Sequence, residues 1–333
     1  ANSVGKPTAI WAMQMNEERT ALTGEKKELF RNDNPWEGNL VEGVSMMRHG
    51  GYFYAFYAAN ACCGRACTYG IGIARSKSLL GPWEKYQNNP VLIEDKRWKC
   101  PGHGTPVEKD GKNYFLYHAY DTASSVFTGR QGLLSEFQYT GDGWIKFVKQ
   151  QSTRTDTSFA VRDEFKNEQL ANLWQWSVFQ PVKYQLKDGC LLLTSLDSFP
   201  MTFVGQKTYS GTYVAVTAIN TRNTNCAAGI AAIGDERNIV SAVVSNGMVR
   251  LIMLKDGKET VVVEQPAPKS KRIHLQMLVE HNNKISFRYG KKNRLRKLAS
   301  SVNMGQVDGD YLPPWDRAVR AGLVVSGKGT GAF

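Results

Sequence analysis

The sequence predicts an all-β chain in two parts, a partial β-propeller followed by an antiparallel β-sandwich of jelly-roll type. In the first half, three segments each run from a turn glycine to an aromatic ring six positions later, and these glycines are Gly5, Gly51 and Gly111. They are 46 and 60 residues apart, a spacing typical of propeller blades rather than of the closely spaced strands of a sandwich. The sequence shows no long amphipathic helix.

Short strands ended by Gly, Pro and Asp-Gly turns fill the stretches between these segments, for example residues 69–74 and 132–137. The first half therefore accounts for about three blades, which cannot close a ring because the smallest propellers have about four. We expect a missing N-terminal propeller segment. Either it is another polypeptide, or this chain is a fragment.

The propeller pattern stops at a polar, aperiodic stretch, residues 151–162, which we interpret as a linker between residues 1–150 and residues 163–333. The second part is a succession of alternating strands. Asn246-Gly247 is a strong hairpin signal, and residues 255–258 give a second one. These features predict the antiparallel sandwich.

Composition places the chain among ordinary globular proteins. Its 333 residues are 42% hydrophobic and 22% charged, enough for two domains with separate cores. No apolar stretch approaches the roughly 20 residues that a membrane span requires, so we predict no membrane span.

The formal net charge of +12 raises the question of a polyanionic partner. The sharpest basic run, residues 291–297, follows an alternating strand at 285–290 and is expected to form a charged turn and an edge strand. No helical or zinc-type DNA-reading motif lies beside it, so we predict no nucleic-acid partner. An acidic polysaccharide or an anionic cell surface explains the charge as well as a nucleic acid does.

The six cysteines are unevenly placed. Three of them, Cys62, Cys63 and Cys67, share one loop, and Cys100 lies downstream. A disulfide within that loop, or from it to Cys100, fits an oxidising compartment, whereas buried free thiols are the alternative. The spacing argues against a structural zinc site because neither a Cys-x-x-Cys pair nor a matching His pair occurs.

One carboxylate in the first half stands out. Glu42 lies between apolar residues at the end of a short strand, and the aromatic run at 52–57 and a strand closed by Gly81-Pro82-Trp83 follow it. A propeller blade presents a catalytic acid at its mouth in this way. Further marks are Ala74-Arg75-Ser76-Lys77-Ser78, Pro101-Gly102-His103-Gly104, Tyr117-His118-Ala119-Tyr120, Gly129-Arg130-Gln131 and Asp142-Gly143-Trp144.

Together these residues resemble glycoside hydrolase family 43, the five-bladed propeller enzymes that attack arabinose- and xylose-containing polysaccharides. One departure is Val44, where the family usually has proline. The second half is similar to the concanavalin-like sandwich often appended to the family, through residues 163–165, 174–176 and 321–323. Such a domain can shape the sugar pocket or simply bind polysaccharide.

The resemblance implies that Glu42 is the general acid of an inverting glycosidase, which needs two carboxyls about 6.5–9.5 Å apart. Apolar neighbours such as Val41 should shield Glu42 from water, which favours the protonated form that an acid needs. A solvated strand-end Glu is the alternative. The general base and a third carboxylate are implied to be Asp residues on the absent N-terminal blades. None of Asp33, Asp95 and Asp121 occupies a matching position.

The same resemblance suggests four further site residues. Arg130 and Arg75 are predicted to contact substrate, and Arg130 has an internal salt bridge as its alternative. Trp36 is predicted to stack on a sugar ring, or else to act as a hydrophobic plug. His103 is predicted to contact a calcium ion on the propeller axis, or else to be a hydrogen-bonded structural residue.

The sequence therefore predicts a secreted or periplasmic glycosidase of arabinofuranosidase or β-xylosidase type, acting on plant cell-wall polysaccharide. The alternative is a non-catalytic carbohydrate-binding protein with an inactive propeller. Two features motivate the alternative, the missing general base and Val44 in place of proline.

Overall fold

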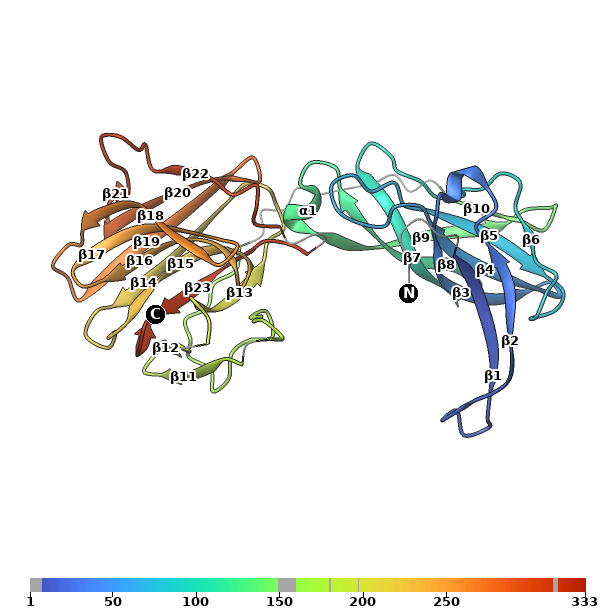
Figure 1. Cartoon of the computed structure of the whole chain (residues 1–333), viewed down its shortest axis with the longest axis horizontal. Helices are drawn as coiled ribbons and strands as arrows, with labels where there is room; N and C mark the ends of the chain where they lie inside the picture. The colour runs from blue at the N-terminus through green and yellow to red at the C-terminus, as the bar shows by residue number, and fades with distance from the viewer. Residues whose placement is uncertain (1–7, 149–159, 180, 197, 314–316) are drawn as a thin grey trace. The chain divides into compact units, whose positions relative to one another are not determined.

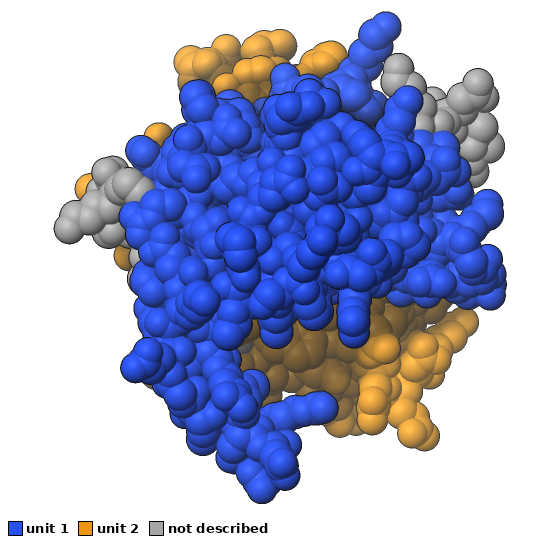
Figure 2. Space-filling view, turned by 90° about the vertical axis from the view of Figure 1, so that its right-hand side faces the viewer, with its two compact units in different colours: residues 1–125, 130–156 blue, residues 126–129, 157–333 orange. Residues whose placement is uncertain are grey.

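The computed structural model describes residues 8–148, 160–179, 181–196, 198–313 and 317–333. The chain divides into two compact units, which Figure 2 draws in different colours. Unit 1 comprises residues 1–125 and 130–156, and unit 2 comprises residues 126–129 and 157–333. Regular structure in the described residues is almost entirely antiparallel β-strand, which confirms the predicted all-β class. Most of the predicted linker, residues 151–162, lies outside the described residues.

Unit 1 contains two four-stranded sheets in which strands adjacent in sequence are adjacent in space, as expected of propeller blades (Figure 1). Their orders are β3-β4-β5-β6 and β7-β8-β9-β10, and β1 and β2 form a separate hairpin. The strands are β1 Ala9–Met15, β2 Leu22–Arg31, β3 Val41–His49, β4 Tyr52–Ala59, β5 Gly70–Ser76, β6 Glu84–Lys85, β7 Trp98–Lys109, β8 Lys112–Asp121, β9 Arg130–Tyr139 and β10 Ile145–Phe147, with the short helix η1 Pro35–Glu37. Helix α1, Ser125–Thr128, falls mostly in unit 2.

The alignment of the three aromatic segments is correct for two of them. The segments that begin at Gly51 and Gly111 form β4 and β8, each the second strand of its sheet. The segment that begins at Gly5 leads into β1. The chain leaves one four-stranded sheet at its fourth strand, β6, and enters the first strand of the next sheet, β7. If β2 leads into β3 in the same way, β2 corresponds to a fourth strand, and β1 corresponds to a third strand rather than a second. The repeat of aromatic rings did not distinguish these two positions.

The core of unit 1 explains why its aromatic run is continuous rather than alternating. Both faces of β4 are covered. Tyr57 and Ala55 pack with Val41 in one cluster, whereas the Phe56 ring lies 5.1 Å from Phe115 on the opposite face. Burial of each such ring stabilises the unit by about 1.5–3 kcal/mol relative to exposure.

The described residues of unit 2 form three antiparallel sheets. The largest has the order β13-β23-β15-β16-β17-β18; the second has β14-β19-β20-β21, with β22 paired to β20; and the third has β11-β12-β24. The strands are β11 Lys183–Lys187, β12 Cys190–Thr194, β13 Thr202–Lys207, β14 Tyr213–Asn220, β15 Ala227–Asp235, β16 Asn238–Ser245, β17 Met248–Lys255, β18 Lys258–Pro266, β19 Arg272–Glu280, β20 Lys284–Lys291, β21 Arg294–Lys297, β22 Gln306–Asp308, β23 Arg320–Ser326 and β24 Thr330–Ala332.

The turns of unit 2 follow the sequence signals. Asn246-Gly247 joins β16 to β17 with Ser245 opposite Met248, and Lys255 lies opposite Lys258 in the next hairpin. Both hairpin predictions are confirmed. The basic run forms the β20–β21 turn and an edge strand, which is also confirmed. Among the described residues, no helix is long and apolar enough to cross a membrane.

Candidate active site

Glu42 is half-buried and is the second residue of β3, so it lies near the start of its strand rather than at the end of a short strand as predicted. The pairing of β3 with β4 shifts between Glu42 and Ser45, where Gly43 has a φ of 57°. This is a β-bulge, which turns a side chain out of the regular alternation. A Cβ on Gly43 would lie 2.8 Å from the His103 ring, so glycine is required both by the backbone angle and by the close approach of His103.

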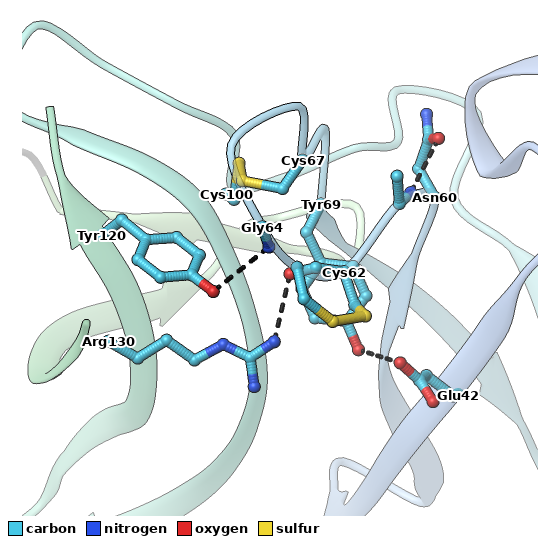
Figure 3. Close-up of a disulfide and its surroundings, with 11 residues drawn as sticks. Glu42, Asn60, Cys62, Gly64, Cys67, Tyr69, Cys100, Tyr120 and Arg130 are labelled. Atoms are coloured by element: carbon cyan, nitrogen blue, oxygen red, sulfur yellow. Dashed lines mark hydrogen bonds between the residues drawn. A yellow bond between two sulfur atoms is a disulfide. The ribbon is translucent and has the colours of Figure 1, made fainter. Parts of the chain in front are cut away.

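Tyr69 holds the carboxylate of Glu42. Its hydroxyl donates a hydrogen bond of 2.7 Å to Glu42 Oε1 (Figure 3). The Tyr69 ring is buried, and burial followed by the neighbouring Glu42 raises the pKa of its hydroxyl, so Tyr69 stays protonated and donates. A Cβ on Gly102 would lie 1.9 Å from the Tyr69 ring, which means that only glycine leaves room for this ring.

Arg130 lies at the start of β9 and organises the neighbouring loop. Its Nη2 donates to the Cys62 carbonyl at 3.2 Å, and its guanidinium carbon is 5.8 Å from the centre of the Tyr120 ring. The Tyr120 hydroxyl in turn accepts a hydrogen bond from the Gly64 amide (Figure 3). Arg130 and Tyr120 thus fix the backbone of the loop that follows β4.

Two disulfides stabilise this region. Cys62 bonds to its neighbour Cys63, and Cys67 bonds to Cys100 with a Cα–Cα distance of 6.0 Å. The predicted loop disulfide and the predicted bond to Cys100 are therefore both present. The second bond ties the loop after β4 to the first strand of the next sheet, β7.

His118 on β8 stacks against Tyr69 with their ring centres 6.1 Å apart. Burial, followed by the charges of Arg130 and His103, lowers the pKa of His118 to about 4. The imidazole is therefore neutral at physiological pH. Its Nδ1 is buried and has no hydrogen-bond partner among the described residues.

The structure brings Glu42, Tyr69, His103, His118 and Arg130 into one region, but it does not bring Arg75 there. Tyr69 immediately precedes β5, which begins at Gly70. Arg75 lies five residues further along this strand, near its other end.

Arg75 is instead engaged in holding unit 1 together. It pairs with Glu84 at 3.0 Å, donates to the Asp142 carbonyl and covers the Trp144 ring at 4.0 Å. In this position Arg75 ties β5 to the β9–β10 turn.

Trp36 is also separated from Glu42. It lies in η1 and packs on Tyr57, with ring centres 5.9 Å apart, in the cluster that contains Val41. Because successive residues of a strand face opposite sides, Glu42 points away from this cluster. The contacts of Trp36 match the hydrophobic-plug alternative.

Several other carboxylates near these elements have structural partners. Glu37 is fully buried, accepts hydrogen bonds from Tyr57 and pairs with Lys85 at 2.8 Å. Asp33 pairs with the same lysine, and Asp95 and Asp121 accept backbone amides in turns. None of these contacts involves Glu42.

His103 is exposed, and its side chain faces the bulge at Gly43. Calcium takes six to eight oxygen ligands, whereas the described residues contain no group of three or more His, Cys, Asp or Glu that could hold an ion. Calcium is also held by backbone carbonyls and water, so the ion at His103 stays a prediction and we derive no step through it.

Sequence reasoning missed Tyr69, His118 and the role of Gly102. Tyr69 is 27 residues from the carboxylate that it orients, and only the fold brings the two together. The Pro-Gly-His-Gly motif did mark the right strand, β7, although the motif drew attention to His103 rather than to Gly102.

Comparison with known proteins defines the class of protein to which this fold and site belong. Residues 1–145 match the profile described as glycosyl hydrolases family 43, and residues 162–330, half of the chain, match the β-xylosidase C-terminal concanavalin A-like domain. The chain belongs to glycosyl hydrolase family 43 and carries this appended domain.

Individual relatives support the assignment. The non-reducing end α-L-arabinofuranosidase BoGH43B of Bacteroides ovatus is 26% identical over 257 residues, which are 68% of this chain and 48% of the relative. The extracellular exo-α-(1→5)-L-arabinofuranosidase ArbA of Cellvibrio japonicus is 27% identical over 128 residues, 36% of either chain. This chain thus spans between about a third and a half of the length of these curated relatives.

Solved structures support the fold. The family-43 protein BlXynB from Bacillus licheniformis superposes with a TM-score of 0.79 at 20% identity, covering 97% of this chain and 69% of that one. Xylan β-1,4-xylosidase from Bacillus halodurans C-125 also gives 0.79, at 17% identity, with 98% and 72% covered. The predicted arrangement of propeller sheets followed by a sandwich is confirmed.

Proposed function

We propose that this protein hydrolyses O-glycosidic bonds at the non-reducing ends of arabinose- or xylose-containing plant polysaccharide, with inversion and with Glu42 as general acid. The hydrogen bond from Tyr69 to Oε1 carries this proposal. It leaves Oε2, which has no partner among the described residues, to donate a proton to the leaving oxygen. The bulge at Gly43 sets the direction of the side chain.

Arg130 is proposed to contact the sugar through its guanidinium group, which offers several donors and also binds the Cys62 carbonyl. The general base is proposed to come from a propeller segment that precedes this chain, because none of Asp33, Asp95 and Asp121 occupies the position that the family resemblance implies for a base. The isolated 333-residue chain should then be inactive on aryl arabinofuranosides and xylosides.

The decisive experiment is Glu42→Gln in the complete protein. Loss of a general acid should lower kcat by about 10²–10⁴-fold on substrates with poor leaving groups, and far less on activated aryl glycosides, which need little protonation. Glu94→Gln, an exposed carboxylate on a loop, is the matched control. Equal losses on both kinds of substrate would contradict the assigned role.

The alternative is a carbohydrate-binding protein with an inactive propeller. Val44 in place of the family's proline motivates it, although Val44 packs against the same cluster as Val41. Binding of arabino- or xylo-oligosaccharide by the complete protein without any release of monosaccharide would favour this alternative.

We also propose a secreted or periplasmic location. Two disulfides suit an oxidising compartment, and the relative ArbA is described as extracellular. The calcium ion at His103 stays a prediction. If it binds, added calcium should raise the melting temperature of the complete protein, and His103→Ala should abolish that increase.

A further inference from the structure

At one end of the sandwich in unit 2, three connecting segments carry only positive charge. These segments meet there, residues 220–226, 266–272 and 290–297, because Asn220 pairs with Arg272 and His274 pairs with Gly290. The three segments contain no Asp or Glu. All of their cations are exposed, and none has an acidic partner among the described residues: Arg222, Lys269, Lys271, Arg272, Lys291, Lys292, Arg294, Arg296 and Lys297.

The opposite end of the same sandwich differs. Its turns and strand ends hold Asp235, Glu236, Asp256 and Glu259 beside their lysines and arginines. The positive charge of unit 2 is thus concentrated at one end, which we call the basic end. Crowding of like charges there is visible at His274, whose pKa is lowered first by burial and then by Lys292 and Arg272.

A cavity of about 340 Å³ opens at this basic end. Lys269 lines it together with the β14–β15 loop and the β16–β17 turn. Ser245 and Asn246 also line it, and neither side chain has a hydrogen-bond partner among the residues that the structure describes. The cavity therefore combines a cation with polar groups that are free to bind the hydroxyls of a ligand.

We propose that the basic end binds an acidic polysaccharide through a uronate residue, whose carboxylate lies against Lys269 and whose hydroxyls bind Ser245 and Asn246. Arg272 and Lys292 attract the neighbouring uronates of the same chain. This site is separate from the proposed hydrolysis and does not depend on it.

A nucleic acid is the other polyanion to consider. The cavity has no aromatic side chain in its lining, so it offers no platform on which a base could stack. The uncommitted hydroxyl and amide groups of the lining therefore favour a sugar.

The test is calorimetric titration of the full 333-residue chain with trigalacturonate and with its methyl ester, which has the same hydroxyls but no charge. We expect the methyl ester to bind at least tenfold more weakly. Lys269→Gln should weaken trigalacturonate binding about tenfold, and Asn246→Gly, which keeps the positive φ of the turn, about threefold. Lys258→Gln, an exposed lysine at the opposite end, should change it less than twofold.

A second readout follows His274 by NMR. Bound uronate should raise its pKa because a carboxylate offsets Lys292 and Arg272. Equal binding of acid and ester, an equal loss in Lys258→Gln, or tighter binding of duplex DNA than of trigalacturonate at physiological salt would each overturn the proposal. The binding assay needs no catalysis, so a failed hydrolase assignment would leave it intact.

Discussion

The Glu42 region of unit 1 and the basic end of unit 2 use polar residues in opposite ways. In the first, a single carboxylate is held by a buried tyrosine, and two glycines allow the surrounding rings to approach closely. In the second, exposed cations surround a cavity whose hydroxyl and amide are uncommitted. Catalysis requires a fixed orientation, whereas capture of an anion requires reachable charge. Substitutions that disturb packing should therefore impair only the Glu42 region. Added salt should weaken ligand binding only at the basic end.

The largest effect should follow from removal of the Cys67–Cys100 disulfide. It ties the loop after β4 to β7, and its loss should destabilise unit 1 by about 2–4 kcal/mol. Denaturant unfolding of Cys67→Ser with Cys100→Ser measures this cost.

Trigalacturonate binding is the control, because the described cysteines of unit 2, Cys190 and Cys226, are free. If the double variant also lost that binding, the two regions would not be independent.

A smaller effect is expected from Gly102→Ala, because the new methyl would collide with the Tyr69 ring. Overpacking of this kind costs about 1–3 kcal/mol and should move the hydroxyl away from Glu42. Gly132→Ala on β9, two strands away in the same sheet, is the matched control, since a methyl there meets nothing within 4 Å. A stability loss that is the same in both variants would show that the Tyr69 contact is not what requires glycine.

His118 makes unit 1 sensitive to acid. Its folded pKa of about 4 lies below the usual 6.5, so the unfolded chain binds more protons between these values. The contribution to stability is complete above about pH 6.5 and is lost as the pH falls toward 4. We expect a loss of about 1–2 kcal/mol after allowance for partial exposure.

Replacement of His118 by Asn should remove that part of the pH dependence. The free energy of unfolding measured at pH 4.5 and pH 7 gives the difference. A variant that keeps the full acid sensitivity of the parent would assign the effect to other groups.

The sequence predicted those features that depend on local patterns. The hairpin at Asn246-Gly247 follows from turn chemistry, and Glu42 follows from a short motif with an aromatic strand after it. The error over β1 has a physical cause, since an aromatic ring six positions after a glycine marks a buried strand but not its place in a blade.

Features that depend on distant contacts were not predictable. Nothing near Tyr69 indicates that its hydroxyl reaches Glu42, and nothing near Arg75 indicates that Asp142 and Trp144 occupy its guanidinium. The basic end also depends on contacts between residues that are far apart in the sequence. The run at 291–297 alone indicates a solvated edge, and only the sheet register brings it beside residues 266–272 and the cavity.

The smallest effect should come from Tyr69→Phe, which removes one hydroxyl and keeps the ring. Loss of a single hydrogen bond to a half-buried carboxylate should cost about 0.5–1.5 kcal/mol of stability. In the complete protein, kcat should fall about tenfold on poor leaving groups while KM stays within twofold, because Glu42 loses its orientation but the sugar contacts do not change. Tyr117→Phe, which loses a hydroxyl contact to Ser135 on the same propeller sheet, is the control. A rise in KM at unchanged kcat would place Tyr69 in sugar binding instead and would remove the contrast between an oriented acid and a merely charged surface.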